Sequence, residues 1–117
     1  MNKEFDIKKR TLSFSKELLA FVAKLPKNDE NNILKKQIIR SGTSIGANVY
    51  ESNGGHSKKD FSNYINIALK SANETLYWFE LIESVNKNLS AEIDILSKET
   101  AELTKILATI AINSRKD

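Results

Sequence analysis

Apolar residues recur every three or four positions along most of this chain of 117 residues, as they do on one face of an amphipathic helix. The pattern predicts four helices, over about residues 6–25, 30–53, 58–87 and 91–114. Short polar connections separate these segments, and short connections favour antiparallel packing of consecutive helices. We therefore predict an all-α fold in which residues 1–117 form one domain, an antiparallel up-down-up-down four-helix bundle.

Residues that stop or cap helices stand at the predicted connections. Pro26 ends the first helix, because proline has no amide hydrogen and disfavours helical geometry in the residue before it. Side-chain oxygens in the polar link 27–29 can cap the second helix, and the glycine pair at 54–55 ends it. The hydroxyls of Ser57 and Ser90 are placed to cap the third and fourth helices.

The second predicted helix has one buried stripe and two glycines. The stripe comprises Leu34, Ile38, Ser41, Ile45, Val49 and Ser52. Gly42 and Gly46 have GxxxG spacing, and each glycine inside a helix costs about 1 kcal/mol relative to alanine. The helix is too polar for a membrane span. We therefore expect a neighbouring helix or another subunit to pack closely on these glycines.

A ridge of polar residues runs beside that stripe at spacings of three or four, which makes them neighbours on the helix surface. It comprises Gln37, Arg40, Ser44, Asn48 and Glu51. Polar groups at the edge of a core need hydrogen-bond partners, and we expect Ser71 and Glu74 on the third helix to supply them in a structural network that fixes helix register. The alternative is acid–base chemistry at Glu51 and Glu74, although no histidine, cysteine or metal-binding pattern accompanies these carboxylates.

The third predicted helix is apolar over more than one stripe. One side alone supplies the residues needed for a bundle core, yet large apolar side chains continue around the helix. A monomer would leave that extra surface in water. We therefore expect a homo-oligomer in which another subunit covers Ile67, Trp78 and Val85.

The composition removes several classes of chemistry. The chain has no cysteine, which excludes disulfides and thiolate metal sites, and its one histidine, His56, is predicted to lie in a turn and is assigned no role. No phosphate-binding loop motif occurs. We expect a non-enzymatic protein with no catalytic residue, metal or cofactor. No segment approaches the ~20 apolar residues of a membrane span and no apolar leader follows the N-terminus, so a cytoplasmic location without membrane contact is expected.

The formal charge of +3 is unevenly distributed. Residues 1–60 contain 12 Lys and Arg against 7 Asp and Glu, whereas residues 61–117 contain 6 against 8. A basic surface attracts phosphates, so RNA or DNA binding by a non-enzymatic oligomer is the leading hypothesis. The expected binding face comprises Lys8, Lys9, Arg10, Lys35, Lys36, Lys58 and Lys59. The alternative is a scaffold that binds a protein partner and no nucleic acid, its charge serving only solubility.

The segment at 37–52, QIIRSGTSIGANVYES, resembles the signature of the four helix bundle protein family, also called ribosomal RNA intervening-sequence proteins. This chain has Gly42, Gly46 and Tyr50 where relatives usually carry alanine or another small residue at one or more positions. Further matches make the resemblance span nearly the whole chain. They lie at 25–27, 57–61, Tyr64, Ile67, Ala68, Ser71, Glu74 and Trp78.

The resemblance implies an antiparallel four-helix bundle that assembles into a homo-oligomeric ring, commonly a pentamer, in bacteria. Some members are encoded within intervening sequences of bacterial large-subunit ribosomal RNA genes. A related bundle is the accessory protein of diversity-generating retroelements, where it binds nucleic acid and a reverse transcriptase. The family as a whole has no established biochemical activity, so the resemblance implies candidate partners and no reaction.

Overall fold

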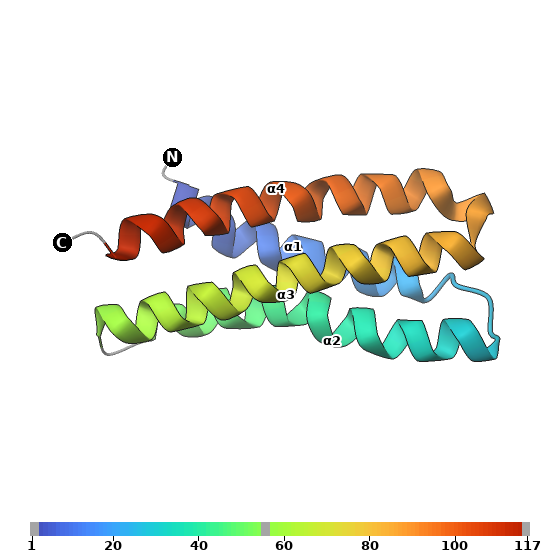
Figure 1. The fold of residues 1–117 in the computed structure, drawn as a ribbon, viewed down its shortest axis with the longest axis horizontal. Helices are drawn as coiled ribbons and strands as arrows, with labels where there is room; N and C mark the ends of the chain where they lie inside the picture. Colours follow the sequence, from blue (N-terminus) through green and yellow to red (C-terminus); the bar gives the residue numbers. More distant parts are fainter. Residues whose placement is uncertain (1–2, 55–56, 116–117) are drawn as a thin grey trace.

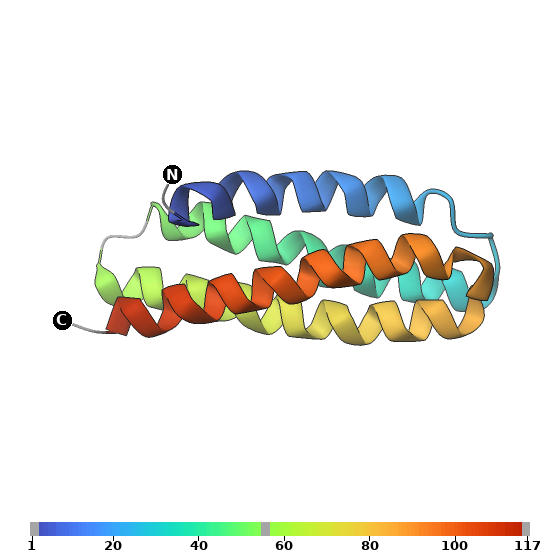
Figure 2. The same cartoon turned by 90° about the horizontal axis from the view of Figure 1, so that it is seen from above.

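The computed structural model describes residues 3–54 and 57–115 (Figure 1). Its elements are α1 (Lys3–Val22), α2 (Asp29–Ser52), α3 (Lys58–Val85), the short 3₁₀ helix η1 (Lys87–Leu89) and α4 (Ser90–Arg115). Consecutive helices run antiparallel in a bundle with principal extents of 49 × 24 × 19 Å (Figure 2). Helices α1 and α3 each pack against α2 and α4. The predicted all-α four-helix bundle is confirmed.

The connections differ from the prediction by a few residues. Helix α1 ends at Val22, three residues before the expected end, because the chain tightens into i→i−3 hydrogen bonds ahead of Pro26. The Lys24 N–H donates to the Phe21 carbonyl at 3.0 Å. The capping role expected for Ser90 is wrong, because its hydroxyl donates to the Lys87 carbonyl at 2.8 Å and Ser90 is itself the first residue of α4.

The other two predicted caps are confirmed. Asn28, in the link before α2, accepts the Asn31 N–H on its side-chain oxygen at 2.8 Å. Ser57 Oγ accepts the Asp60 N–H at 3.1 Å at the start of α3. Each of these oxygens accepts a hydrogen bond from one of the backbone amides that a helix start leaves without a backbone partner. Gly54 follows the end of α2, while Gly55 and His56 lie outside the described residues.

The core runs along the bundle axis and draws on all four helices. Burying each large apolar side chain contributes about 1.5–3 kcal/mol relative to leaving it in water. Rings from α1 and α3 meet in the core near the end of α1, where the centroids of Phe21 and Phe79 are 6.4 Å apart. The largest apolar side chains that are fully buried are Phe14, Leu18, Ile38, Ile45, Ile65, Phe79, Ile82, Ile93, Leu103 and Leu107.

Helix α1 packs closely against the two glycines of α2. A Cβ at Gly42 would overlap Leu18 Cδ2, and a Cβ at Gly46 would lie 3.2 Å from the Thr11 backbone oxygen. Leu18 and Thr11 are both buried. Of the two expectations for these glycines, close packing by a neighbouring helix is therefore confirmed, and the neighbour is α1.

Across residues 3–54 and 57–115, no helix combines the length and the apolar character needed to cross a bilayer. Each of the four helices divides its surface into a buried apolar stripe and a more polar exterior. The arrangement brings the start of α1, the end of α2, the start of α3 and the end of α4 to one end of the bundle (Figure 1). We call this the α1-start end.

Candidate functional site

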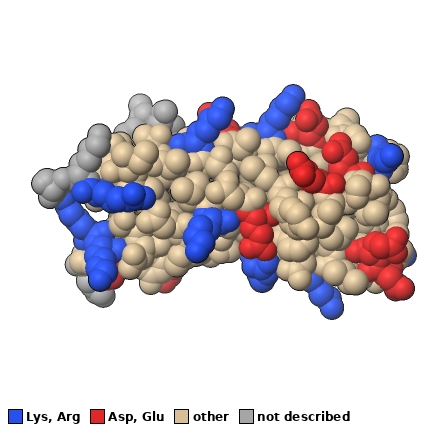
Figure 3. Space-filling model, in the orientation of Figure 1, with Lys and Arg blue, Asp and Glu red and all other residues tan. Residues whose placement is uncertain are grey.

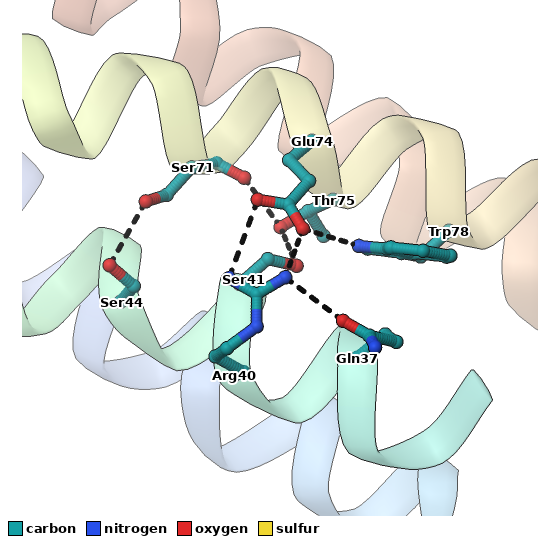
Figure 4. Close-up of polar contacts among 8 residues, drawn as sticks. All are labelled: Gln37, Arg40, Ser41, Ser44, Ser71, Glu74, Thr75 and Trp78. Atoms are coloured by element: carbon teal, nitrogen blue, oxygen red, sulfur yellow. Dashed lines mark hydrogen bonds and ion pairs between the residues drawn. The ribbon is translucent and has the colours of Figure 1, made fainter. Parts of the chain in front are cut away.

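Hydroxyl groups line the middle of the contact between α2 and α3 (Figure 4). Thr75 Oγ1 and Ser41 Oγ share a hydrogen bond of 2.9 Å, and Ser71 Oγ donates to Ser44 Oγ at 2.9 Å. Asn48 extends this group along α2 by donating to the carbonyl and the hydroxyl of Ser44, at 2.8 and 3.0 Å. The two hydroxyl pairs join α2 to α3 at fixed heights along the bundle, since each needs matched atoms on both helices.

An ion pair forms the exposed edge of the same contact. The Arg40 guanidinium pairs with the Glu74 carboxylate and also donates to Gln37 Oε1 at 3.0 Å. Trp78 Nε1 donates to Glu74 Oε2 at 2.8 Å. The hydrogen bonds from Arg40 and then Trp78 hold the pKa of Glu74 below its usual range, because they stabilise the ionised form.

The structure therefore brings most of the predicted polar network together in two groups. Arg40 links Gln37 to Glu74, and Ser44 links Asn48 to Ser71. Glu51 is different, because its exposed side chain lines a groove against α1, on the other side of α2. Glu51 therefore faces the α1 side of α2, whereas Glu74, on α3, lies at the opposite side of α2, so the two carboxylates that the acid–base alternative invoked do not share a site.

Two parts of the α2–α3 contact were missed by sequence reasoning. Ser41 was assigned to the apolar stripe, and its partner Thr75 was not considered, although both side chains are fully buried. Nearer the opposite end, the buried amides of Asn31 and Asn86 bond reciprocally at 2.8 and 3.1 Å. Asn31 lies seven residues before Ile38, so extending the predicted stripe backwards would have found a polar residue at a core position.

The three residues predicted to contact another subunit remain at the surface of this chain. Ile67 and Val85 are each 46% exposed. Trp78 is half-buried, with its ring packed on the core and its N–H committed to Glu74. A further exposed apolar residue of α2, Ile33, lines a shallow groove with Val85.

The predicted basic face is divided between the two ends of the bundle. Lys8 and Lys9 in α1 lie toward the α1-start end, as do Lys58 and Lys59 in α3. Lys35 and Lys36 lie near the start of α2; at 1.5 Å per residue, Lys35 is about 25 Å from the last residue of that helix. Arg10 forms an ion pair with Glu99 of α4 at 2.6 Å.

The excess of positive charge is nevertheless concentrated at the α1-start end (Figure 3). Among described side chains of that half, at 7–12, 41–54, 57–71 and 103–115, eight Lys or Arg face two Asp or Glu. The other half, at 13–40 and 72–102, has eight against ten. The imbalance seen along the sequence is therefore an imbalance along the long axis of the bundle, and one end carries the positive potential.

Grooves flank α1 on both sides. Between α1 and α4 lies a cavity of about 720 Å³ whose lining includes the Arg10–Glu99 pair. Between α1 and α2 lies a second cavity of about 590 Å³, lined by Leu12, Tyr50 and Glu51 among others. No group of three or more potential metal-ligating side chains occurs within the described part of the chain.

The comparisons with known proteins agree with this architecture. A family model described as "23S rRNA-intervening sequence protein" matches residues 3–109. A crystal structure of a protein with unknown function from the S23 ribosomal protein family of Bacteroides thetaiotaomicron superposes with a TM-score of 0.87. The two sequences are 35% identical, and the match covers 94% of this chain and 98% of the other. No curated protein sequence matches this chain.

Proposed function

This chain belongs to the 23S rRNA-intervening sequence protein family, and we propose that it is a cytoplasmic, non-enzymatic homo-oligomer that binds structured RNA through its α1-start end. The observation that carries this proposal is the charge at that end, where basic side chains outnumber acidic ones eight to two among those described. The family description names a ribosomal RNA, which makes RNA the first nucleic acid to test.

Contact with phosphates accounts for how such an end would bind. Each lysine that neutralises a phosphate releases condensed counterions, so affinity falls as the salt concentration rises. For a duplex, the logarithm of the binding constant falls with the logarithm of the salt concentration by about 0.9 per phosphate contact. Lys8 and Lys9 come from α1, whereas Lys58 and Lys59 come from α3. The hydrogen bonds between α2 and α3 support this role, since they fix the height at which α3 presents its lysines.

The test is a fluorescence anisotropy titration with duplex fragments of 23S ribosomal RNA at several salt concentrations. Replacing Lys8, Lys9, Lys58 and Lys59 by glutamine is expected to weaken binding at least tenfold and to flatten the salt dependence. The matched control replaces Lys16, Lys27, Lys35 and Lys36, which removes the same charge from the other half. Equal losses in both variants, or no binding by the wild type at low salt, would refute the proposal.

The oligomer is a separate part of the proposal, supported by the exposed apolar surface of α3. Ile67 and Val85 are large side chains left in water by this chain alone, and covering them would recover apolar surface. The ring proposed is the pentamer that the family resemblance implies. Native mass spectrometry measures it directly, and Ile67→Lys is expected to yield monomers. Ile95→Lys on α4, where the side chain is 68% exposed, is the control and should leave the assembly intact.

A non-catalytic role is proposed for the polar groups of the contact between α2 and α3. Glu74 is held ionised by Arg40 and Trp78, so it is poorly suited to give or take protons near neutral pH. The second candidate function is a scaffold for a protein partner, favoured by the apolar groove that Ile33 and Val85 line. A pull-down that survives nuclease treatment and is lost in Val85→Glu would support the scaffold over the RNA-binding function.

A further inference from the structure

The groove between α1 and α2 holds an exposed aromatic ring beside a basic residue. Tyr50 is 63% exposed, and the Lys8 ammonium lies 4.4 Å from the centroid of its ring. Both residues belong to the α1-start end, and both line the cavity of about 590 Å³. A solvent-exposed ring next to a lysine combines the two features by which proteins hold unpaired nucleotides, a stacking platform and a partner for phosphate.

We propose that this groove binds an unpaired guanine of an RNA loop, stacked on Tyr50, while Lys8 pairs with the adjoining phosphate. This inference rests on the proposed RNA binding and adds a second, base-specific contact to it. Stacking requires the base to replace Lys8 on the Tyr50 ring, and the strengths of the two contacts favour this exchange. An exposed cation–π contact is worth roughly two- to fivefold in affinity, whereas base–aromatic stacking is worth roughly five- to a hundredfold.

The floor of the groove leaves room for a flat ligand. Gly46 has no side chain and Ala47 has only a methyl group, and the neighbouring Leu12 adds an apolar wall. A Cβ at position 46 would lie 3.2–3.3 Å from Thr11, so the absence of a side chain there eases the helix contact and also leaves the groove open. A planar base fits such a surface because its two faces are apolar while its edge carries the hydrogen-bonding groups.

The polar groups of the groove favour a base with donors on its edge. The Thr43 hydroxyl, which lines the groove, donates to the Ile39 carbonyl at 2.6 Å, so it has only lone pairs left for a ligand. Glu51 adds an acceptor carboxylate at the rim.

This pattern of acceptors selects guanine among the bases. Guanine presents two adjacent donors, its ring N–H and its amino group, which match the two oxygens of the Glu51 carboxylate. The same negative charge disfavours a phosphate inside the groove, which leaves the phosphate to Lys8 at the edge.

The experiment uses three RNA hairpins with one stem and a loop that carries guanine, inosine or an abasic site, titrated at low salt. The wild type is expected to bind the guanine loop about tenfold more tightly than the abasic loop, with inosine between them because it lacks the amino group. Tyr50→Ala should remove this difference while leaving affinity for the abasic hairpin unchanged, since the basic end sets that affinity. Tyr50→Phe should keep the difference, because the ring remains.

The control is Tyr77→Ala, which removes a similarly exposed tyrosine from the other half of the bundle and should change nothing. Glu51→Gln is expected to bring guanine and inosine to equal affinity. If all three hairpins bind the wild type equally well, the base site is refuted and the phosphate-binding end stands. If no hairpin binds at low salt, the proposed RNA binding fails first and the base site with it.

Discussion

Helix α2 packs against its two neighbours, α3 and α1, through opposite kinds of contact. Toward α3 it presents hydroxyls and amides that bond to matched groups, as in Ser41 with Thr75 and Asn31 with Asn86. Toward α1 it presents Gly42 and Gly46, which have no side chain and let the other helix come close. Hydrogen bonds specify the height of one helix against another, whereas glycines specify the distance between them.

The two sides should therefore be vulnerable to opposite changes. Among the described residues, every buried side-chain nitrogen or oxygen has a hydrogen-bond partner. A satisfied polar contact contributes little net stability but is costly when one partner is removed. A close-packed glycine contact is costly when atoms are added. The contact of α2 with α3 should be destabilised by removing polar side-chain atoms, and its contact with α1 by adding side-chain atoms.

The largest expected effect is at the asparagine pair. Asn31→Leu removes both bonds to Asn86 and the bond to the Pro26 carbonyl, which leaves buried polar atoms without partners. We expect the free energy of unfolding to fall by about 2–3 kcal/mol, measured by urea denaturation. The double variant with Asn86→Leu should be more stable than Asn31→Leu alone, because two apolar groups replace the orphaned amide. Additive losses would show that the pair is not a coupled unit.

Next in size is the contact of α1 with Gly42. Alanine there gains about 1 kcal/mol of helix propensity, but its Cβ overlaps the buried Leu18, and overpacking costs about 1–3 kcal/mol. We expect a net loss of up to about 2 kcal/mol in the free energy of unfolding, measured by thermal or chemical denaturation. Gly46→Ala is the matched control, since its Cβ would lie 3.2–3.3 Å from Thr11 and the strain should roughly cancel the propensity gain. Equal losses at both glycines would contradict this account.

A smaller effect is expected for the hydroxyl pair. Ser41→Ala leaves the Thr75 hydroxyl its bond to the Ser71 carbonyl at 2.7 Å, so only part of the network is lost. We expect about 1 kcal/mol of destabilisation, measured as a double-mutant cycle with Thr75→Val. The coupling should be favourable and below about 1.5 kcal/mol. A coupling of zero would mean that the two hydroxyls do not interact in solution.

These two sides also show what the sequence could predict. Helix positions follow from a local periodicity, so the four helices and the caps at Asn28 and Ser57 were found within a few residues. The spacing of the two α2 glycines likewise indicated a close approach, because a glycine inside a helix needs a reason to be there. The role of Ser41 was missed because a serine in an apolar stripe becomes informative only when its partner, Thr75, is known to lie opposite it.

The basic residues show a similar limit of prediction from the sequence. Lys36 and Lys58 were placed on one face because both precede the midpoint of the chain, yet α2 carries the chain from one end of the bundle to the other between them. The up-down order was itself predicted, and applying it to the charges would have separated Lys35 and Lys36 from the rest. What sequence alone could not supply was the groove beside Tyr50, because its walls come from two helices.

The smallest expected effect is at the exposed edge of the α3 side, where Arg40 meets Glu74. The pKa of Glu74 is lowered in the folded chain below its usual 4.5, so the stability it adds is complete above that value and is lost as the pH falls through the folded pKa. Because the two side chains are 58% and 37% exposed, solvent screens the pair and its coupling should not exceed about 1 kcal/mol.

The measurement for this pair is the unfolding free energy of the wild type and Glu74→Gln from pH 7 to 3. Their difference should shrink only below about pH 4.5, and 1 M salt should reduce it at pH 7. The Asn31→Leu loss should persist in the same salt, since that pair is buried and uncharged. A pH-independent difference would show that Glu74 acts through packing or its bond from Trp78, and that the ion pair adds nothing to the polar side of α2.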